Sequence, residues 1–109
     1  MLTVLAMIPT YNESENIAFL IKDILGLSPS YGVLVVDDDS PDGTSDIVAR
    51  LAKDEPRIQL LLRKTDRGRG IAGIEGLLKA AKQDVRYVVE MDADFSHHPR
   101  YIPELVAAM

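Results

Sequence analysis

The chain has 109 residues, of which 47% are hydrophobic, and 12 basic and 17 acidic side chains give it a formal net charge of -5. This length and hydrophobic content fit one folded domain or part of a larger one, and they exclude a disordered tail. The acidic balance argues against an extended nucleic-acid-binding surface, and the absence of cysteine excludes disulfides and thiolate metal sites.

Four apolar runs of strand length alternate with segments of helical periodicity. The expected strands span residues 2–8, 31–36, 58–62 and 87–91. The first of these runs lacks a basic flank and is too short for a secretory or membrane-spanning segment. The expected helices carry apolar residues at helical spacing: Ile17, Leu20, Ile21, Ile24 and Leu25; Ile47, Val48, Leu51 and Ala52; and Ile71, Ile74, Leu77 and Leu78.

Capping and breaking residues predict where these elements end. Pro9 is expected to stop the first strand, because proline has no N–H for a sheet ladder. Asn12 or Ser14 is expected to cap the first helix, and Gly26 to end it. Pro56 is expected to end the second helix, and a last short helix is expected between Pro99 and Pro103, running on through Leu105 and Val106.

The alternation predicts an α/β fold, in which a mostly parallel sheet with alternating helices is covered on both faces in a Rossmann-like arrangement. Ligands of such sheets bind beyond the carboxyl ends of the strands. The loops at residues 9–13, 37–43 and 92–99 all follow strands. We therefore expect three segments that lie far apart in the sequence to converge at one edge of the sheet.

Two carboxylates, Asp92 and Asp94, follow the last expected strand and are separated by one residue. Side chains two apart in an extended chain lie on the same side, so both carboxylates can face one ion. Such a pair suits Mg2+ or Mn2+, which takes its other ligands from water and a substrate diphosphate. Ser96 can add a hydroxyl or a water contact. The pair by itself favours a helix cap in a soluble loop over a metal site.

Other polar motifs leave alternatives open. His97 and His98 suit either metal ligation or an exposed helix start. The segment 42–44 (Asp-Gly-Thr) favours a turn followed by a helix cap over a ligand contact. Residues 68–73 match G-x-G-x-x-G, but residues 63–67 separate them from the preceding strand, which disfavours a dinucleotide site. The acidic run at 37–39 also suits a receiver-like, magnesium-binding signalling domain.

Three motifs in order resemble the family-2 glycosyltransferases, and within them most closely the dolichol-phosphate mannose synthases. They are IPTYNE at 8–13, VVDDDSPDGT at 35–44 and MDADFSHHP at 91–99. The resemblance implies that residues 1–109 form the N-terminal nucleotide-sugar-binding part of an incomplete GT-A domain. It implies nucleotide-sugar contacts from Pro9, Tyr11, Glu13, Val36, Asp38, Asp92, Ala93 and Asp94, with Asp92 and Asp94 also catalytic and metal-binding.

The implied activity is the inverting transfer of mannose from GDP-mannose to dolichyl or polyprenyl phosphate, dependent on Mg2+ or Mn2+. A UDP-sugar donor on the same fold is the close alternative. A phosphate monoester has a second pKa near about 6, so such an acceptor is already anionic at neutral pH and needs no strong general base. The resemblance places the protein in the cytoplasm, peripheral on the cytosolic face of a membrane, with no nucleic-acid partner.

Overall fold

A computed structural model describes residues 2–64, 76, 79–80, 82–91 and 103 of the chain. Within these ranges the elements alternate as expected. In chain order they are β1 (Val4–Thr10), α1 (Ile17–Leu25), β2 (Tyr31–Asp37), α2 (Thr44–Asp54), β3 (Ile58–Leu62) and β4 (Tyr87–Glu90). None of the helices in the described ranges combines the length and apolar character needed to cross a bilayer.

The four strands form one sheet in the order β3-β2-β1-β4, and each neighbouring pair is parallel. This confirms the predicted α/β class with a parallel sheet. The chain passes from β1 through β2 to β3 on one side, and then places β4 on the other side of β1. The strand order therefore reverses between β1 and β4, which is where parallel α/β sheets commonly bind ligands.

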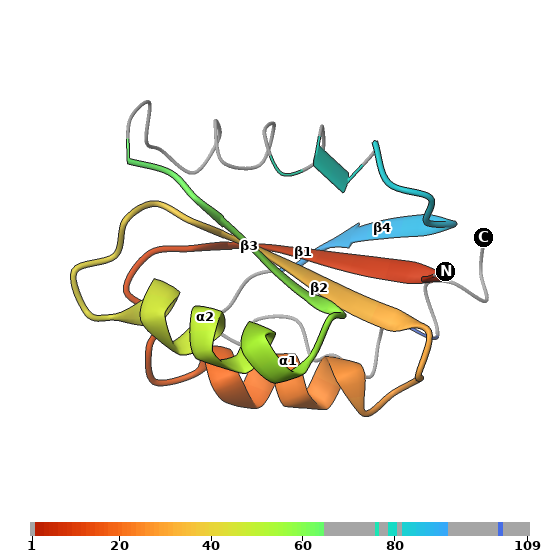
Figure 1. Ribbon diagram of the computed structural model, residues 1–109, viewed down its shortest axis with the longest axis horizontal. Coiled ribbons are helices and arrows are strands. Elements are labelled where there is room, and N and C mark those ends of the chain that lie inside the picture. The colour runs from red at the N-terminus through yellow and green to blue at the C-terminus, as the bar shows by residue number, and fades with distance from the viewer. Residues whose placement is uncertain (1, 65–75, 77–78, 81, 92–102, 104–109) are drawn as a thin grey trace.

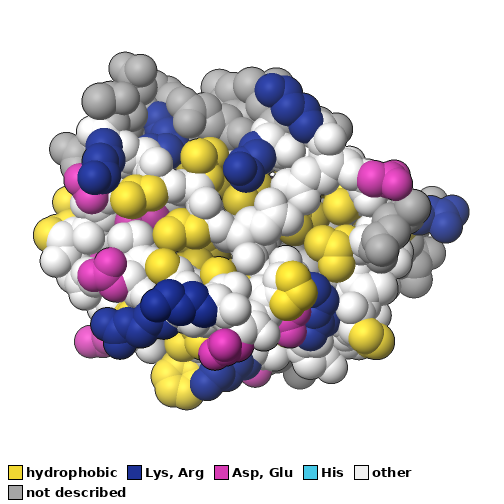
Figure 2. All heavy atoms as spheres, viewed as in Figure 1, with side chains coloured by type: hydrophobic (Ala, Val, Ile, Leu, Met, Phe, Trp, Pro, Cys, Tyr) yellow, Lys and Arg dark blue, Asp and Glu magenta, His cyan; other side chains and the backbone are white. Residues whose placement is uncertain are grey.

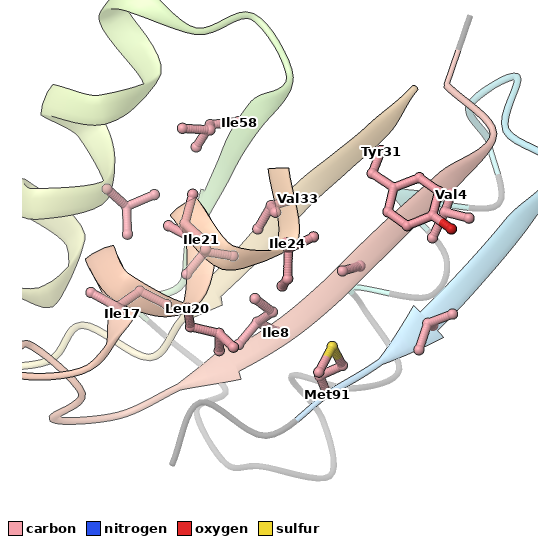
Figure 3. Close-up of a cluster of buried hydrophobic side chains, with 14 residues drawn as sticks. Val4, Ile8, Ile17, Leu20, Ile21, Ile24, Tyr31, Val33, Ile58 and Met91 are labelled. Atoms are coloured by element: carbon pink, nitrogen blue, oxygen red, sulfur yellow. The ribbon is translucent and has the colours of Figure 1, made fainter. Parts of the chain in front are cut away.

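One face of the sheet packs against α1 and α2, which lie side by side below it in Figure 1. Because strand side chains alternate, Val4, Ala6 and Ile8 of β1 all point to this face. Figure 3 shows the apolar side of α1 facing these strands, and all of its members are fully buried: Ile17, Leu20, Ile21 and Ile24. Met91, just after β4, belongs to the same cluster.

The opposite face carries a second apolar cluster, to which β1 contributes Leu5 and Met7 and β2 contributes Leu34 and Val36. Buried Ala80 belongs to the same cluster. Gly76, Lys79, Ala80 and Pro103 are helical. Helical residues thus cover both faces, as predicted, while the rest of the third and last expected helices lies outside the described residues.

The predicted end of the first strand was wrong, because β1 continues through Pro9 and Thr10. β4 pairs with β1 only from Val4 to Met7, so Pro9 lies beyond that ladder. The missing proline N–H consequently removes no bond to β4. On the other side, Thr10 still pairs with Asp37 of β2.

The predicted N-cap of the first helix was wrong, and its predicted C-terminal end is confirmed. Asn16 is the N-cap of α1 and makes no side-chain cap bond, so neither Asn12 nor Ser14 caps this helix. The Glu13 carbonyl instead accepts the N–H groups of Asn16 and Ile17. Gly26 ends the helix as predicted, and its N–H donates to the Lys22 carbonyl at 3.0 Å.

Candidate functional site

The carboxyl ends of β1, β2 and β3 lie at one edge of the sheet, because these strands are parallel. In Figure 1 the loops after β1 and β2 both emerge at the left end. Figure 2 shows several acidic side chains over the same end. The predicted convergence of residues 9–13 with residues 37–43 is therefore present in the structure.

A buried hydrogen-bond network joins the ends of β1 and β2. The Thr10 hydroxyl donates to Asp37 Oδ1 at 2.6 Å, and the Ser40 hydroxyl donates to the same oxygen at 2.6 Å. The backbone N–H of Ser40 donates to Asp37 Oδ2 at 2.9 Å. Asp37 is fully buried, so these donors supply the hydrogen bonds that its carboxylate would otherwise lose with water. Asp37 thus ties the two strand ends together.

The loop after β1 is bound to the loop after β2 through three consecutive backbone amides. Asn12 donates to Ser40 Oγ at 2.9 Å, Glu13 to Thr44 Oγ1 at 3.1 Å, and Ser14 to Asp42 Oδ2 at 3.0 Å. Asp42 Oδ1 also accepts the Thr44 N–H at 3.1 Å and the Thr44 hydroxyl at 2.5 Å. The predicted turn at 42–44 is confirmed, whereas the N-cap of α2 is Gly43, which makes no side-chain cap bond. Asp42 instead accepts the first N–H of the helix and also binds the loop after β1.

Desolvation raises the pKa of Asp42, but the hydrogen bonds from Thr44 and Ser14 together outweigh it and lower the pKa to about 2. Asp42 therefore carries its charge throughout the neutral range.

Three positions in these loops have left-handed backbone conformations: Asn12 and Asp39, each with φ of 56°, and Gly43 with φ of 87°. Asn and Asp tolerate this region better than most residues with a Cβ, and glycine adopts it freely. The non-glycine residues Asn12 and Asp39 keep this conformation where surrounding contacts fix it, and such positions are concentrated at functional sites.

Arg63, the first residue after β3, adds a buried ion pair to this edge. Its Nη1 donates to Asp38 Oδ1 at 2.9 Å, and the Arg63 N–H donates to the Asp37 carbonyl at 2.8 Å. From the sequence, Arg63 was only part of the segment 63–67 that separates the glycine motif from the preceding strand. The sequence signal for Arg63 is a charged side chain directly after an apolar strand, at the edge where the candidate site lies.

The predicted nucleotide-contacting residues of the first two loops occupy different environments. Pro9 is buried, Tyr11 is 54% exposed and Glu13 is partly buried. Val36 is fully buried within the second apolar cluster, so its contribution to a ligand would come from the backbone. Asp38 is 7% exposed and paired with Arg63.

The predicted acidic site lies outside the described residues, and so do the neighbouring candidates: Asp92, Ala93, Asp94, Ser96, His97, His98, Gly68, Gly70 and Gly73. Met91, which directly precedes Asp92, donates its N–H to the Met7 carbonyl at 3.0 Å. The described chain thus reaches the edge between β1 and β4, where the strand order reverses. Within residues 2–64 and 82–91 no group of three or more acidic or histidine side chains is placed to hold a metal ion.

Comparison with known proteins links this arrangement to sugar transfer. The family model described as glycosyl transferase family 2 matches residues 6–109. The chain is 42% identical over 106 residues to an undecaprenyl-phosphate mannosyltransferase of Micrococcus luteus, covering 97% of this chain and 44% of that protein. It is 38% identical over 106 residues to a polyprenol monophosphomannose synthase of Mycolicibacterium smegmatis, covering 96% of this chain and 40% of that protein. The chain therefore spans less than half the length of these relatives.

Solved structures show the same fold. The mannosyltransferase PcManGT from Pyrobaculum calidifontis, in complex with GDP-Man and Mn2+, has a TM-score of 0.66 and 33% identity, covering 84% of this chain and 27% of that one. S. aureus TarS 1–349 has a TM-score of 0.73 over 97% of this chain and 32% of that one. At 22% identity, TarS supports the fold alone.

Proposed function

Since the chain belongs to glycosyl transferase family 2, we propose that it is the nucleotide-sugar-binding part of an enzyme that transfers mannose from GDP-mannose to a polyprenyl phosphate. The two curated relatives, at 42% and 38% identity, are both mannosyl-transferring enzymes of polyprenyl phosphates. The relative of solved structure, at 33% identity, holds GDP-Man and Mn2+. These matches favour a GDP-mannose donor over a UDP-sugar.

The observation that carries the proposal is the joining of the loops after β1 and β2 at the carboxyl edge, beside the reversal of strand order. A nucleoside needs an aromatic or apolar surface for its base and acceptors for its N–H and O–H groups. Tyr11 offers an exposed ring there. Glu13 and Asp38 offer carboxylate oxygens, which accept hydrogen bonds from base and ribose donors.

The strand order favours this assignment over the receiver-like alternative. Receiver-type sheets have the order 2-1-3-4-5, in which β3 lies beside β1. Here β3 pairs with β2, and β4 lies beside β1. The family match points the same way.

The strand order also bears on the dinucleotide motif. It follows the Rossmann pattern 3-2-1-4, in which the dinucleotide fingerprint sits on the first crossover. The loop after β1, residues 11–16, contains no glycine. A nicotinamide or flavin site is therefore not proposed.

Asp92, Asp94 and Ser96 supply only oxygen donors, a set that fits Mg2+ or Mn2+. When bound, the ion would neutralise the negative charge that develops on the departing GDP. Asp92 and Asp94 would hold the ion, and Ala93 between them is a further nucleotide-sugar contact that the family resemblance implies. The acceptor phosphate, already anionic, would attack the sugar without a strong general base.

The test uses the protein expressed from its complete reading frame. Radiolabelled GDP-mannose is incubated with undecaprenyl phosphate in detergent, with Mg2+, Mn2+ or EDTA, and label in the organic phase is counted. We expect lipid-linked mannose that requires the divalent ion, and no comparable product from UDP-glucose. Transfer from the UDP-sugar alone would show that the donor is a UDP-sugar and not GDP-mannose. Failure to bind or transfer any nucleotide sugar would overturn the proposal.

The acceptor also gives an expectation for where the protein acts. A polyprenyl phosphate resides in a membrane, whereas a nucleotide sugar is water-soluble. We propose that the protein works at the cytosolic surface of a membrane. Co-sedimentation with vesicles that contain undecaprenyl phosphate, compared with vesicles that lack it, tests this part separately.

A further inference from the structure

The loop that carries Tyr11 and Glu13 is held by side chains of the neighbouring loop. The oxygens that accept the amides of Asn12, Glu13 and Ser14 belong to residues 28 to 31 positions further along the chain. These bonds are therefore tertiary contacts, and they go beyond what capping α2 requires. They determine the backbone path on both sides of Glu13.

The direction of the Thr44 hydroxyl follows from its partners. A hydroxyl has one proton, and Thr44 gives it to Asp42 Oδ1 at 2.5 Å. Its lone pairs are then directed to other donors, and the Glu13 N–H lies 3.1 Å away. Asp42 thus orients Thr44 and at the same time accepts the Ser14 N–H through Oδ2 at 3.0 Å.

We propose that Asp42 and Thr44 are positioning residues for nucleotide binding, which fix the backbone at Glu13 and so direct its carboxylate toward the base. The inference rests on the proposed function, in which Glu13 contacts the nucleotide. Glu13 adjoins Asn12, whose left-handed φ of 56° is retained only while neighbouring contacts fix it. Thr44 itself is fully buried beneath the loop, so it acts through Glu13 without touching the nucleotide.

The first experiment compares GDP-mannose affinity among three variants of the protein expressed from its complete reading frame. Thr44→Val keeps the shape of the side chain and removes the oxygen, whereas Thr44→Ser keeps the oxygen. Ala49→Gly destabilises α2 from its exposed side without touching the loop after β1. Titration calorimetry well below the unfolding temperature gives Kd for each.

We expect Thr44→Val to raise Kd for GDP-mannose roughly tenfold, which corresponds to about 1.4 kcal/mol. Thr44→Ser and Ala49→Gly are expected to stay near the wild-type Kd. If Thr44 only stabilises α2, Thr44→Val and Ala49→Gly should instead resemble each other in both stability and Kd. That result would overturn the proposal.

The second experiment needs no nucleotide. Amide hydrogen exchange of Glu13 and Ser14, followed by NMR, reports directly on the bonds in question. We expect faster exchange at both amides in Thr44→Val and no change in Ala49→Gly. Unchanged exchange in Thr44→Val would refute the positioning role. If the wild type binds no GDP-mannose, the proposed function fails, while the exchange result still decides whether Thr44 fixes this loop.

Discussion

Arg63 Nη1 lies 2.9 Å from Asp38 Oδ1, and the two side chains are 2% and 10% exposed. This ion pair connects the residue that follows β3 with the residue that follows β2. Because both groups are withdrawn from water, each charge partly compensates the desolvation of the other. Asp38 is also a predicted nucleotide contact, so the pair links the stability of the edge to the geometry of the proposed site.

Removal of the Arg63 charge is expected to destabilise the protein strongly. Arg63→Met keeps an unbranched side chain but removes the guanidinium that pairs with the buried Asp38 carboxylate. We expect the free energy of unfolding to fall by about 3 kcal/mol, measured by urea denaturation. Lys64→Met is the matched control, because Lys64 is the exposed neighbour and should change stability by less than about 0.5 kcal/mol. Equal stability of both variants would show that the pair contributes little.

Gly76 is expected to tolerate no side chain, because it sits directly on the sheet. A Cβ there would lie 2.7 Å from Met7 Sδ and 2.9 Å from Val36 Cγ2. Met7 can shift, but Val36 is β-branched and belongs to a central strand. We expect Gly76→Ala to lower the free energy of unfolding by about 1–3 kcal/mol.

Gly26→Ala is the control for this substitution. Gly26 has an ordinary φ of −72°, and a Cβ there meets only backbone oxygens at 3.3 and 3.6 Å. Its stability should stay within about 0.5 kcal/mol of wild type in the same denaturation series. If the Gly76→Ala protein were as stable as the Gly26→Ala protein, the backbone at Gly76 could move away from the sheet to make room for the methyl group.

The fold could be predicted because its two central strands, β1 and β2, are apolar runs buried on both faces, and such runs imply a parallel sheet. The errors arose where tertiary contacts competed with local signals. Asn12, Ser14 and Asn16 are all residue types that cap helices, and the amides of Asn12 and Ser14 are taken by Ser40 and Asp42. Nothing local in the sequence distinguishes Asn16 from the other two.

The site could be predicted only in part, for a related reason. Strand ends show which loops share an edge, so the convergence of residues 9–13 with residues 37–43 was foreseeable. Partners within that edge were not, because the pairing of Asp38 with Arg63 spans 25 residues and leaves no periodic pattern. The metal-binding roles of Asp92, Asp94 and Ser96 remain predictions, since these residues lie outside the described ranges.

The stability that Asp42 contributes should disappear in acid. Its pKa is lowered from 3.8 to about 2 in the folded protein, so folding favours the charged form. That contribution is fully present above the unfolded pKa and is lost as the pH falls through the folded pKa. Asn resembles the protonated carboxyl group, so we expect the stability gap between wild type and Asp42→Asn to be constant above about pH 5 and to close toward pH 2.

Thermal unfolding measured across this pH series checks the expectation for Asp42. Thr44→Ser serves as the control, because it keeps both donors to Asp42 and should follow the wild-type profile. A gap between wild type and Asp42→Asn that persists unchanged at pH 2 would show that the hydrogen bonds from Thr44 and Ser14 do not favour the ionised carboxylate.

The predicted metal ligands give the sharpest test of the chemistry. Asp92→Ala and Asp94→Ala should each reduce metal-dependent mannose transfer by roughly hundredfold or more, because a bound ion contributes several kcal/mol of charge stabilisation. The fold should be unaffected, since both residues follow β4 in the sequence, outside the four described strands. Asp84→Asn is the matched control: this exposed acid precedes β4, at the opposite edge from the candidate site. Normal turnover by Asp92→Ala or Asp94→Ala, with circular dichroism confirming the fold, would remove Asp92 and Asp94 from the metal site.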